Sequence, residues 1–439
     1  MRNGNSVLPL LAILKNEYSA MQATLQYAQQ LDEKDALNHF RERFFIPQID
    51  GKEVVYLCGN SLGLQPKSVG AYIQEELDKW QNLAVLAHHD GKNPWMYYHK
   101  LFSQPLASLT GALESEVVCM NQLTVNLNLL LVSFYRPTPT RYKVLMQSPE
   151  FPSDVYAVQQ QVKFHGYNPQ EAIIEVAPRL GEHTIRTEDI LAAIDEHKDE
   201  LALVMFSALN YYNGQLFDIK TISKKCCDYK LIFGLDLAHT IGNVPLKLHE
   251  WNIDFATWCS YKYLNSGPGG VSGIFVHEHH HSNFDLPRFA GWWGNDESIR
   301  FLMRKEFKPM VGAEGWQQSN APILSMAAHL ASLNIFEQAG IENLRNKSIR
   351  LTAFTEFLIL EKIRATKNIN VEIITPSNQQ DRGCQLSLRV KQNGKQIHQK
   401  LTAENFICDW REPDVIRIAP VPLYNTYQDV FHFTEAFFS

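Results

Sequence analysis

One lysine in this sequence has surroundings that favour covalent chemistry. Lys262 ends a mainly apolar run over residues 255–259 and stands between the aromatic side chains of Tyr261 and Tyr263. Burial of an amine disfavours its charged form and lowers its pKa, and a neutral lysine can form a Schiff base with a carbonyl compound. Glycines within 267–270 let the backbone turn sharply behind it. Taken alone, the stretch is equally typical of a surface loop that carries a lysine.

An acidic residue and a histidine precede this lysine. Asp236 follows the predicted strand 231–235 directly, and His239 comes soon after it. A carboxylate at a strand end can hold a protonated pyridine nitrogen, which makes the ring an electron sink. Asp236 could equally cap a helix, and His239 alone is typical of an ordinary loop histidine.

Two further segments open predicted helices. Residues 121–124 lie at a helix start, where free backbone N–H groups favour an anion such as phosphate, and the Thr124 hydroxyl adds a donor. Phe151 begins the next helix, and its ring could cover one face of a flat cofactor. A capping residue and a core phenylalanine are the plain alternatives. In chain order, the segments predict a phosphate site, a stacking ring, a pyridine-nitrogen acid and a Schiff-base lysine.

The elements that would position these residues alternate between strands and helices. Short apolar runs predict strands at 117–120, 143–147, 201–207, 231–235, 255–260 and 273–277, with helical periodicity between several of them. Alternation of this kind predicts an α/β fold with a mainly parallel sheet, in which ligands gather at the carboxyl ends of the strands.

The domain organisation follows from changes in this pattern. We expect a helical segment over 1–45, a large α/β domain over 46–310 whose first part could pack with the small domain, and a smaller α+β domain over 311–439. The last part combines long helical stretches at 323–339 and 344–363 with short strands.

Composition limits the classes of partner. The 439 residues are 45% hydrophobic and 20% charged, as in ordinary globular proteins, and the net charge of −6 gives no reason to expect nucleic acid or an anionic membrane as a partner. No apolar run is long enough to span a membrane, and no signal peptide is expected. Seven scattered cysteines indicate a reducing compartment, so we expect a cytoplasmic protein.

One histidine-rich run imitates a zinc-protease motif. Residues 277–281 read His-Glu-His-His-His and formally satisfy the pattern H-E-x-x-H. That chemistry requires both histidines on one face of a helix, whereas this run ends a predicted strand. We interpret it as a solvated loop and assign no metal site, although whether the run binds metal stays open.

Several longer motifs resemble those of the kynureninases, which are pyridoxal-phosphate (PLP) enzymes of fold type I. The resemblance extends from about residue 50 to the C-terminus, and its motifs are GNSLGLQP at 59–66, LTVNL at 123–127, FPSD at 151–154, DLAH at 236–239, SYKYLN at 260–265, GWWG at 291–294, SNAP at 319–322 and IRIAP at 416–420. It implies the fold-type-I transferase fold, with a seven-stranded sheet in the large domain, and PLP as cofactor.

The resemblance also implies roles for individual residues. Lys262 would hold the cofactor and move substrate protons, with Tyr261 protonating the alanyl fragment, and Arg417 would bind the substrate carboxylate. His88, Asn320 and Ser61 would face the substrate. The presence of both His88 and Asn320 favours 3-hydroxykynurenine as the preferred substrate. Which of the neighbouring histidines, His88 or His89, faces the substrate is left open by the motif. The implied cofactor-binding residues are Leu123, Thr124, Phe151, Pro152, Ser153, Asp154, Ser207, Asp236, His239, Tyr261, Lys262, Trp292 and Asn320.

The implied reaction is hydrolysis of the Cβ–Cγ bond of L-kynurenine or L-3-hydroxykynurenine, which gives alanine and anthranilate or 3-hydroxyanthranilate. It belongs to tryptophan catabolism and NAD biosynthesis. The resemblance further implies a homodimer with shared active sites, in which Trp292 reaches the other subunit.

Two alternative functions are possible for a chain with these motifs. A cysteine desulfurase or an aminotransferase has the same fold, but a desulfurase needs a reactive cysteine on a mobile loop, and Cys384 and Cys408 lie in strand-like surroundings. An inactive regulator or scaffold would be expected to lack Lys262, Asp236 or Arg417, and all three are present.

Overall fold

The computed structural model describes residues 21–366 and 370–439. The chain divides into two units, each with its own hydrophobic core. Unit 1 comprises 21–64, Tyr212–Gly214 and Glu342–Ser439, and unit 2 comprises Gln65–Tyr211 and Gln215–Ile341. None of the helices in the described ranges is both long and apolar enough to cross a membrane.

The strands of unit 2 form one sheet of seven strands among the described residues, in the order β4-β10-β9-β8-β7-β5-β6. Only β10 runs against its neighbours, so the predicted mainly parallel sheet is confirmed. The bounds are β4 Val117–Cys119, β5 Lys143–Gln147, β6 Ile173–Val176, β7 Leu201–Ser207, β8 Ile232–Asp236, β9 Phe255–Trp258 and β10 Gly273–Val276.

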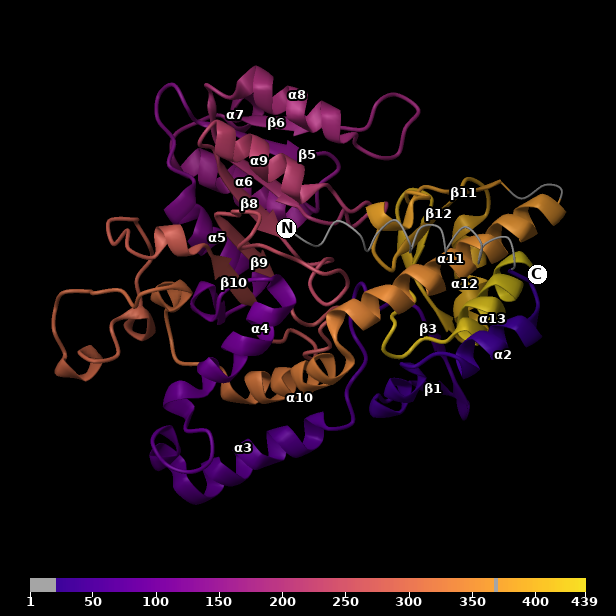
Figure 1. The fold of residues 1–439 in the computed structure, drawn as a ribbon, viewed down its shortest axis with the longest axis horizontal. Coiled ribbons are helices and arrows are strands. Elements are labelled where there is room, and N and C mark those ends of the chain that lie inside the picture. Colours follow the sequence, from indigo (N-terminus) through magenta and orange to yellow (C-terminus); the bar gives the residue numbers. More distant parts are fainter. Residues whose placement is uncertain (1–20, 367–369) are drawn as a thin grey trace, which may run out of the picture. The chain divides into compact units, whose positions relative to one another are not determined.

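Helices cover this sheet because its central strands are apolar on both faces. In β7 nearly every side chain is buried, as expected for a strand covered on both sides. Helices α5 and α6 pack against each other, as do α8 and α9, and right-handed crossovers place these two pairs on opposite faces of the sheet. Figure 1 shows α3 beside α10, and these two helices are in contact. The helices of unit 2 are α3 Val69–Leu83, α4 Ser103–Thr110, α5 Leu123–Phe134, α6 Pro152–Phe164, α7 Pro169–Ala172, α8 Thr187–His197, α9 Ile219–Asp228 and α10 Ile323–Ala339.

Unit 1 contains an antiparallel sheet in the order β11-β12-β15-β14, covered by helices. Short strand β3 pairs in parallel with β13. The elements are α2 Leu25–Glu33, β1 Gln48–Ile49, β2 Lys52–Glu53, β3 Val55–Tyr56, α11 Ile341–Ala365, β11 Val371–Ile373, β12 Leu386–Val390, α12 Gly394–Ala403, β13 Phe406–Ile407, β14 Asp409–Arg411, β15 Val415–Ile418 and α13 Tyr427–Phe438.

This division differs from the predicted domain boundaries. Residues 46–64, expected at the start of the large domain as a part that could pack with the small domain, belong to unit 1, where β3 pairs with β13. Residues 311–341, expected in the small domain, belong to unit 2, where α10 packs along α3. Of the helical segment predicted over 1–45, residues 1–20 lie outside the described residues, and the remainder contains α2 and a 3-10 turn at Asn38–Arg43.

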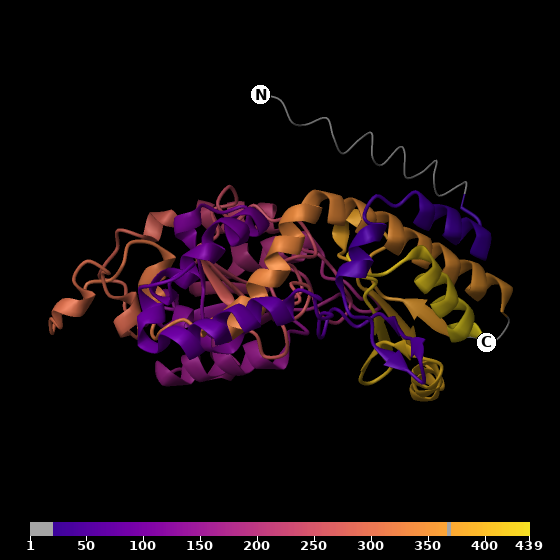
Figure 2. The ribbon, with the colours of Figure 1, turned by 90° about the horizontal axis from the view of Figure 1, so that it is seen from below.

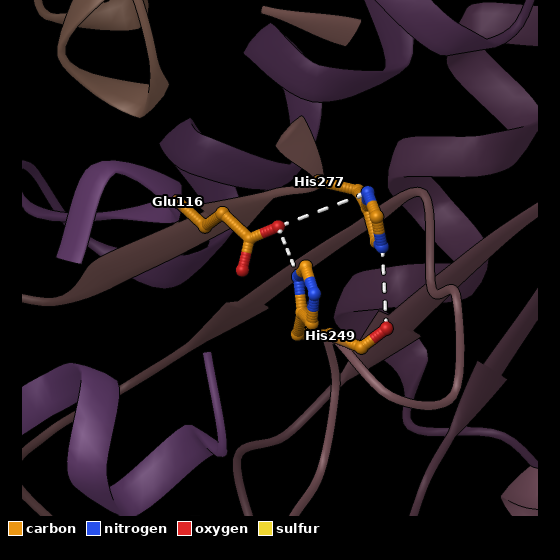
Figure 3. Close-up of side chains that lie close together, drawn as sticks. All are labelled: Glu116, His249 and His277. Carbon is orange, nitrogen blue, oxygen red and sulfur yellow. Dashed lines mark hydrogen bonds and ion pairs between the residues drawn. The ribbon is translucent and has the colours of Figure 1, made fainter. Parts of the chain in front are cut away.

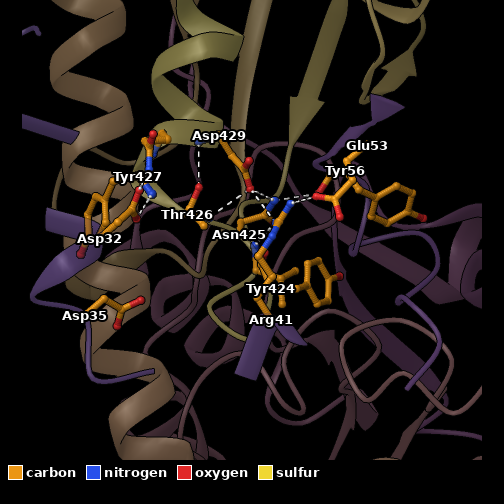
Figure 4. A network of polar contacts seen from close by, with 12 residues as sticks. Asp32, Asp35, Arg41, Glu53, Tyr56, Tyr424, Asn425, Thr426, Tyr427 and Asp429 are labelled. Atoms are coloured by element: carbon orange, nitrogen blue, oxygen red, sulfur yellow. Dashed lines mark hydrogen bonds and ion pairs between the residues drawn. The ribbon is translucent and has the colours of Figure 1, made fainter. Parts of the chain in front are cut away.

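The N-terminal part of unit 1 is attached to the last helix of the chain. Helix α2 runs beside α13 in both ribbon views (Figures 1 and 2). The buried carboxylate of Asp32 accepts hydrogen bonds from the backbone N–H groups of Tyr427 (2.7 Å) and Gln428 (3.1 Å). Figure 4 shows this network, in which Arg41 also forms an ion pair with Asp429 at 3.2 Å. Asp32 therefore satisfies two N–H groups that every helix start leaves without an intrahelical partner.

Replacement of Asp32 should destabilise unit 1. The substitution Asp32→Ala leaves the first N–H groups of α13 without their acceptor in a buried place, and we expect the free energy of unfolding to fall by about 1–3 kcal/mol. Urea unfolding followed by circular dichroism measures this loss. Glu33→Ala, at the exposed next position of α2, is the matched control and should change stability by less than about 0.5 kcal/mol. Equal stability of the two variants would contradict the capping role.

Candidate active site

Most of the predicted cofactor-binding residues line one pocket in unit 2. They follow β4, β5, β7, β8 and β9, whose carboxyl ends share one edge of the sheet. The lining residues are Leu123, Thr124, Phe151, Ser153, Asp154, Ser207, Leu209, Tyr211, Asp236, Ala238, His239, Cys259, Tyr261 and Lys262.

Lys262 lies at the centre of this group. Its Nζ atom is 3.0 Å from Nε2 of His239 and 5.8 Å from the centre of the Phe151 ring. The lysine can donate to Nε2 of a neutral imidazole, so this contact favours the tautomer with its proton on Nδ1. Phe151 is 39% exposed, so one face of a flat molecule beside Lys262 could stack on it.

Buried carboxyl groups gather beside the lysine. Asp236 ends β8, and its carboxylate accepts a hydrogen bond from the N–H of Ala238. Burial raises the pKa of Asp154 well above its usual range, and the negative charges of Asp236 and Glu150 add to this effect. Neither carboxyl oxygen of Asp154 has a hydrogen-bond donor among the described residues. Such a group of acids is suited to a buried cation such as a protonated pyridine nitrogen.

Two helix starts meet at another side of the pocket. Thr124 belongs to the first turn of α5 and Ser153 to the first turn of α6, and their hydroxyl oxygens are 2.8 Å apart. Neither helix has a side-chain cap, so the first N–H groups of α5 and that of Ser153 in α6, whose first residue Pro152 has no N–H, are open to an anion. The predicted phosphate site therefore has two helix starts and two hydroxyl donors.

These residues fit PLP. The uncapped starts of α5 and α6 suit its phosphate, the open face of Phe151 suits its ring, and the buried acids suit its protonated nitrogen. Lys262 supplies the amine. Pro152, predicted beside them, is the first residue of α6.

Other predicted site residues lie outside the pocket lining. Trp292 belongs to the 3-10 turn Trp292–Gly294, is 44% exposed and donates a hydrogen bond to the carbonyl of Arg300. Asn320 is exposed. His88 is half-buried and contacts Trp95 edge to face, whereas His89 is exposed.

Ser61 and Arg417 belong to unit 1. Ser61 is exposed in the turn after β3. Arg417, on β15, is only 1% exposed, and its guanidinium forms an ion pair with Asp409 on the neighbouring strand β14. Arg411 forms a second ion pair with the same carboxylate at 3.1 Å. Asp409 therefore fixes the orientation of the Arg417 side chain within this sheet.

The sequence did not identify Glu150 as a site residue. It does not line the pocket, but it holds two lining residues, Phe151 and Ser207, in place. Its carboxylate accepts hydrogen bonds from Ser207 Oγ (2.8 Å) and from the N–H of Phe151 (2.6 Å), and it thereby ties the ends of β5 and β7 together. Burial raises its pKa to about 7, and the charge of Asp236 adds to the shift. The signal that the sequence offered for Glu150 was its position directly before the FPSD motif. Tyr211 was also missed; its ring meets Phe151 edge to face.

Solved structures with the same fold are PLP enzymes of fold type I. The cysteine desulfurase CsdA of Escherichia coli matches with a TM-score of 0.73 over 91% of this chain and 97% of its own, at 14% identity. The cystine C–S lyase C-DES, solved as a mutant with glycine linked covalently to its PLP cofactor, matches with a TM-score of 0.72 over 88% and 96%, at 16% identity. The predicted fold class is therefore confirmed, and these likenesses concern the fold alone.

The sequence is much closer to one family. The profile of the kynureninase C-terminal domain matches residues 344–437. The kynureninase of Flavobacterium psychrophilum is 52% identical over 94% of this chain and 97% of its own, and that of Nematostella vectensis is 48% identical over 93% and 92%. The chain belongs to the kynureninase family.

The raised pKa of Glu150 predicts a pH-dependent loss of stability in the cofactor-free protein. Its folded pKa of about 7 lies above the ordinary value of 4.5, so its contribution is complete below pH 4.5 and is lost as the pH rises through 7. Relative to Glu150→Gln, the wild type should lose on the order of 3 kcal/mol of unfolding free energy across this window.

Urea unfolding at several pH values measures this difference. Glu175→Gln, at an exposed position of β6, is the control and should parallel the wild type. A difference between wild type and Glu150→Gln that does not change with pH would contradict the assignment.

Proposed function

We infer that this chain is a kynureninase, a PLP-dependent hydrolase that cleaves the Cβ–Cγ bond of L-kynurenine or L-3-hydroxykynurenine. The products are alanine and anthranilate or 3-hydroxyanthranilate. The observation that carries this inference is the pocket around Lys262 in a chain about half identical to kynureninases over nearly its whole length.

The pocket residues would divide the binding of the cofactor among them. Lys262 would hold it covalently, Asp236 would pair with the ring nitrogen, and Phe151 would stack on the ring. The starts of α5 and α6 would hold the phosphate through Thr124 and Ser153. When bound, the cofactor supplies an electron sink that stabilises negative charge on the substrate.

Proton movements would fall to side chains of the same pocket. Lys262, once released by the substrate amine, would remove the proton from Cα, and its neighbour His239 at 3.0 Å would keep it oriented. Burial raises the pKa of Tyr261, so its hydroxyl stays protonated near neutral pH and can donate a proton to Cβ of the alanyl fragment. A water molecule would add to the side-chain ketone before the Cβ–Cγ bond breaks.

We also propose a homodimer with shared active sites. Trp292 lies outside the pocket lining of its own chain and has an exposed ring, which supports a role in the site of a second subunit. The surrounding segment exposes several large apolar side chains, as a surface that binds another protein often does. Its exposed large apolar side chains are Phe289, Trp292, Phe301, Leu302, Met303, Phe307 and Val311.

Substrate choice and cellular role belong to the same proposal. His88 and Asn320 would face the aromatic end of the substrate, with a preference for 3-hydroxykynurenine, and Ser61 would lie beside it. The enzyme would act in tryptophan catabolism and NAD biosynthesis in the cytoplasm. The alternative function of a cysteine desulfurase has no support from Cys384 or Cys408, since both thiols are buried.

The direct test is release of anthranilate, followed by its fluorescence, from purified protein with PLP and either substrate. We expect turnover of both, with the higher kcat/KM for 3-hydroxykynurenine. Lys262→Ala should lose the visible absorption of the bound cofactor and all turnover, because Lys262 is the only lysine among the described residues that line the pocket. An intact cofactor spectrum without turnover of either substrate would refute the assigned reaction.

Arg417 should act mainly on substrate binding. Arg417→Lys keeps a positive charge for Asp409 but loses the planar fork that binds a carboxylate through two hydrogen bonds. We expect KM to rise about 10- to 100-fold with a smaller change in kcat, as for the loss of a charged hydrogen bond of about 1.5–3 kcal/mol. Arg411→Ala removes the other partner of Asp409 and is the control. An equal rise in KM for both variants would exclude a specific role of Arg417.

A further inference from the structure

Two sets of metal-binding side chains lie at the edge of the sheet where β9 begins and β10 ends. The register pairs Phe255 with Val276, so the residues before β9 meet those after β10. One set consists of Glu116, His249 and His277, and the other consists of Asp254, His279 and His280. The sequence interpretation as a solvated loop is wrong for His277, which is only 5% exposed. The run does follow a strand, as predicted: β10 ends at Val276, and Glu278–His280 then form a 3-10 turn.

Hydrogen bonds explain the first set without a metal ion (Figure 3). Nδ1 of His249 is 2.9 Å from Oε1 of Glu116, a charge-assisted hydrogen bond. His277 has a backbone partner for each ring nitrogen, since Nε2 donates to the carbonyl of His249 and Nδ1 accepts from the N–H of His279. The 3.7 Å between Nδ1 of His277 and Glu116 is too long for a hydrogen bond.

Hydrogen bonds to Asp254 leave a conflict in the second set, because its two imidazole nitrogens also lie in contact with each other. Oδ1 of Asp254 is 3.2 Å from Nε2 of His279 and 2.8 Å from Nε2 of His280, and the two nitrogens are only 2.9 Å apart. The ionised carboxylate only accepts, and each neutral imidazole nitrogen either donates or accepts. Any assignment of protons therefore places two donors or two acceptors in contact.

A single cation resolves this conflict because all three atoms can direct lone pairs at it. Zinc binds imidazole nitrogen at about 2.0–2.1 Å and carboxylate oxygen at about 2.0–2.2 Å, so tetrahedral ligand atoms are about 3.3 Å apart. The separations of 2.8–3.2 Å in this set are close to that value. The other oxygen of Asp254 accepts from the N–H of Phe233 at 2.7 Å, which fixes the carboxylate as outer contacts do in metal sites.

The imidazoles are also held in place by packing. The ring of His279 stacks on that of His277 with 4.1 Å between centres, and His280 meets the buried Phe134 edge to face at 4.9 Å. The side chain of His279 is 44% exposed, which leaves one side of the set open to water. Three protein ligands with an open fourth position is an arrangement that zinc accepts.

We propose that Asp254, His279 and His280 bind one divalent transition-metal ion, for which zinc is the probe. The ion joins the segment before β9 to the turn after β10 and thereby fastens the antiparallel pair whose other end leads to Lys262. Its role is structural, and it takes no part in the reaction at the pocket.

The test uses untagged, PLP-loaded protein and Zn²⁺ competed against a chromophoric chelator. The wild type should bind one equivalent per chain, and the double variant His279→Ala/His280→Ala should bind at least about 100-fold more weakly. Saturating zinc should raise the Tm of the wild type and leave that of the double variant unchanged. Cofactor absorbance shows that each protein is folded, and His279→Ala alone replaces the double variant if the latter does not load PLP.

His249→Ala is the matched control because it removes a histidine from the neighbouring set. It should bind zinc as tightly as the wild type. Equal zinc affinity of the wild type and the double variant, or loss of binding in His249→Ala alone, would overturn the proposal.

Discussion

The pocket depends on how the negative charge of three buried carboxyl groups near Lys262 is offset. Glu150, Asp154 and Asp236 are each less than a tenth exposed, and their mutual repulsion adds to the cost of removing them from water. Such a group persists in a folded protein where a cation offsets it, and the charge of Lys262 partly offsets the raised pKa of Asp154. A protonated ring nitrogen placed against Asp236 would complete the balance, and the acids would then favour the protonation state that makes the cofactor an electron sink.

The sequence predicted this pocket well because parallel topology converts chain order into proximity. Runs such as Lys143–Gln147 and Leu201–Ser207 have a continuous apolar centre, which is typical of strands buried on both faces, and their observed bounds match the prediction. Residues after such strands must share one edge of the sheet, so Asp236, Phe151 and Lys262 could be grouped without knowledge of any contact. Long, regular elements such as α10 were also predicted to the residue.

The features that the sequence did not predict depend on pairing between distant segments. β6, with the short sequence Ile-Ile-Glu-Val at the edge of the sheet, is half-buried and carries little periodicity. The sequence allowed the first part of the large domain to pack with the small domain, but it did not identify the pairing of β3 with β13, far along the chain, that accompanies the position of 46–64 in unit 1. Glu150 likewise gains its role from Ser207 on another strand.

The antiparallel strand β10 explains both why the histidine cluster was misread and why its metal site would be structural. Because β10 returns against β9, the run that follows it lies beside Asp254, at the opposite end of β9 from Lys262. Four residues of extended strand separate these ends by about 13 Å, which is too far for a metal-bound group to reach the pocket. An ion there can act only through the strand, by resisting separation of β9 from β10 at the end where the sheet is open to solvent. A metal ion at the far end of β9 would make the strand that leads to Lys262 more rigid without adding charge to the pocket.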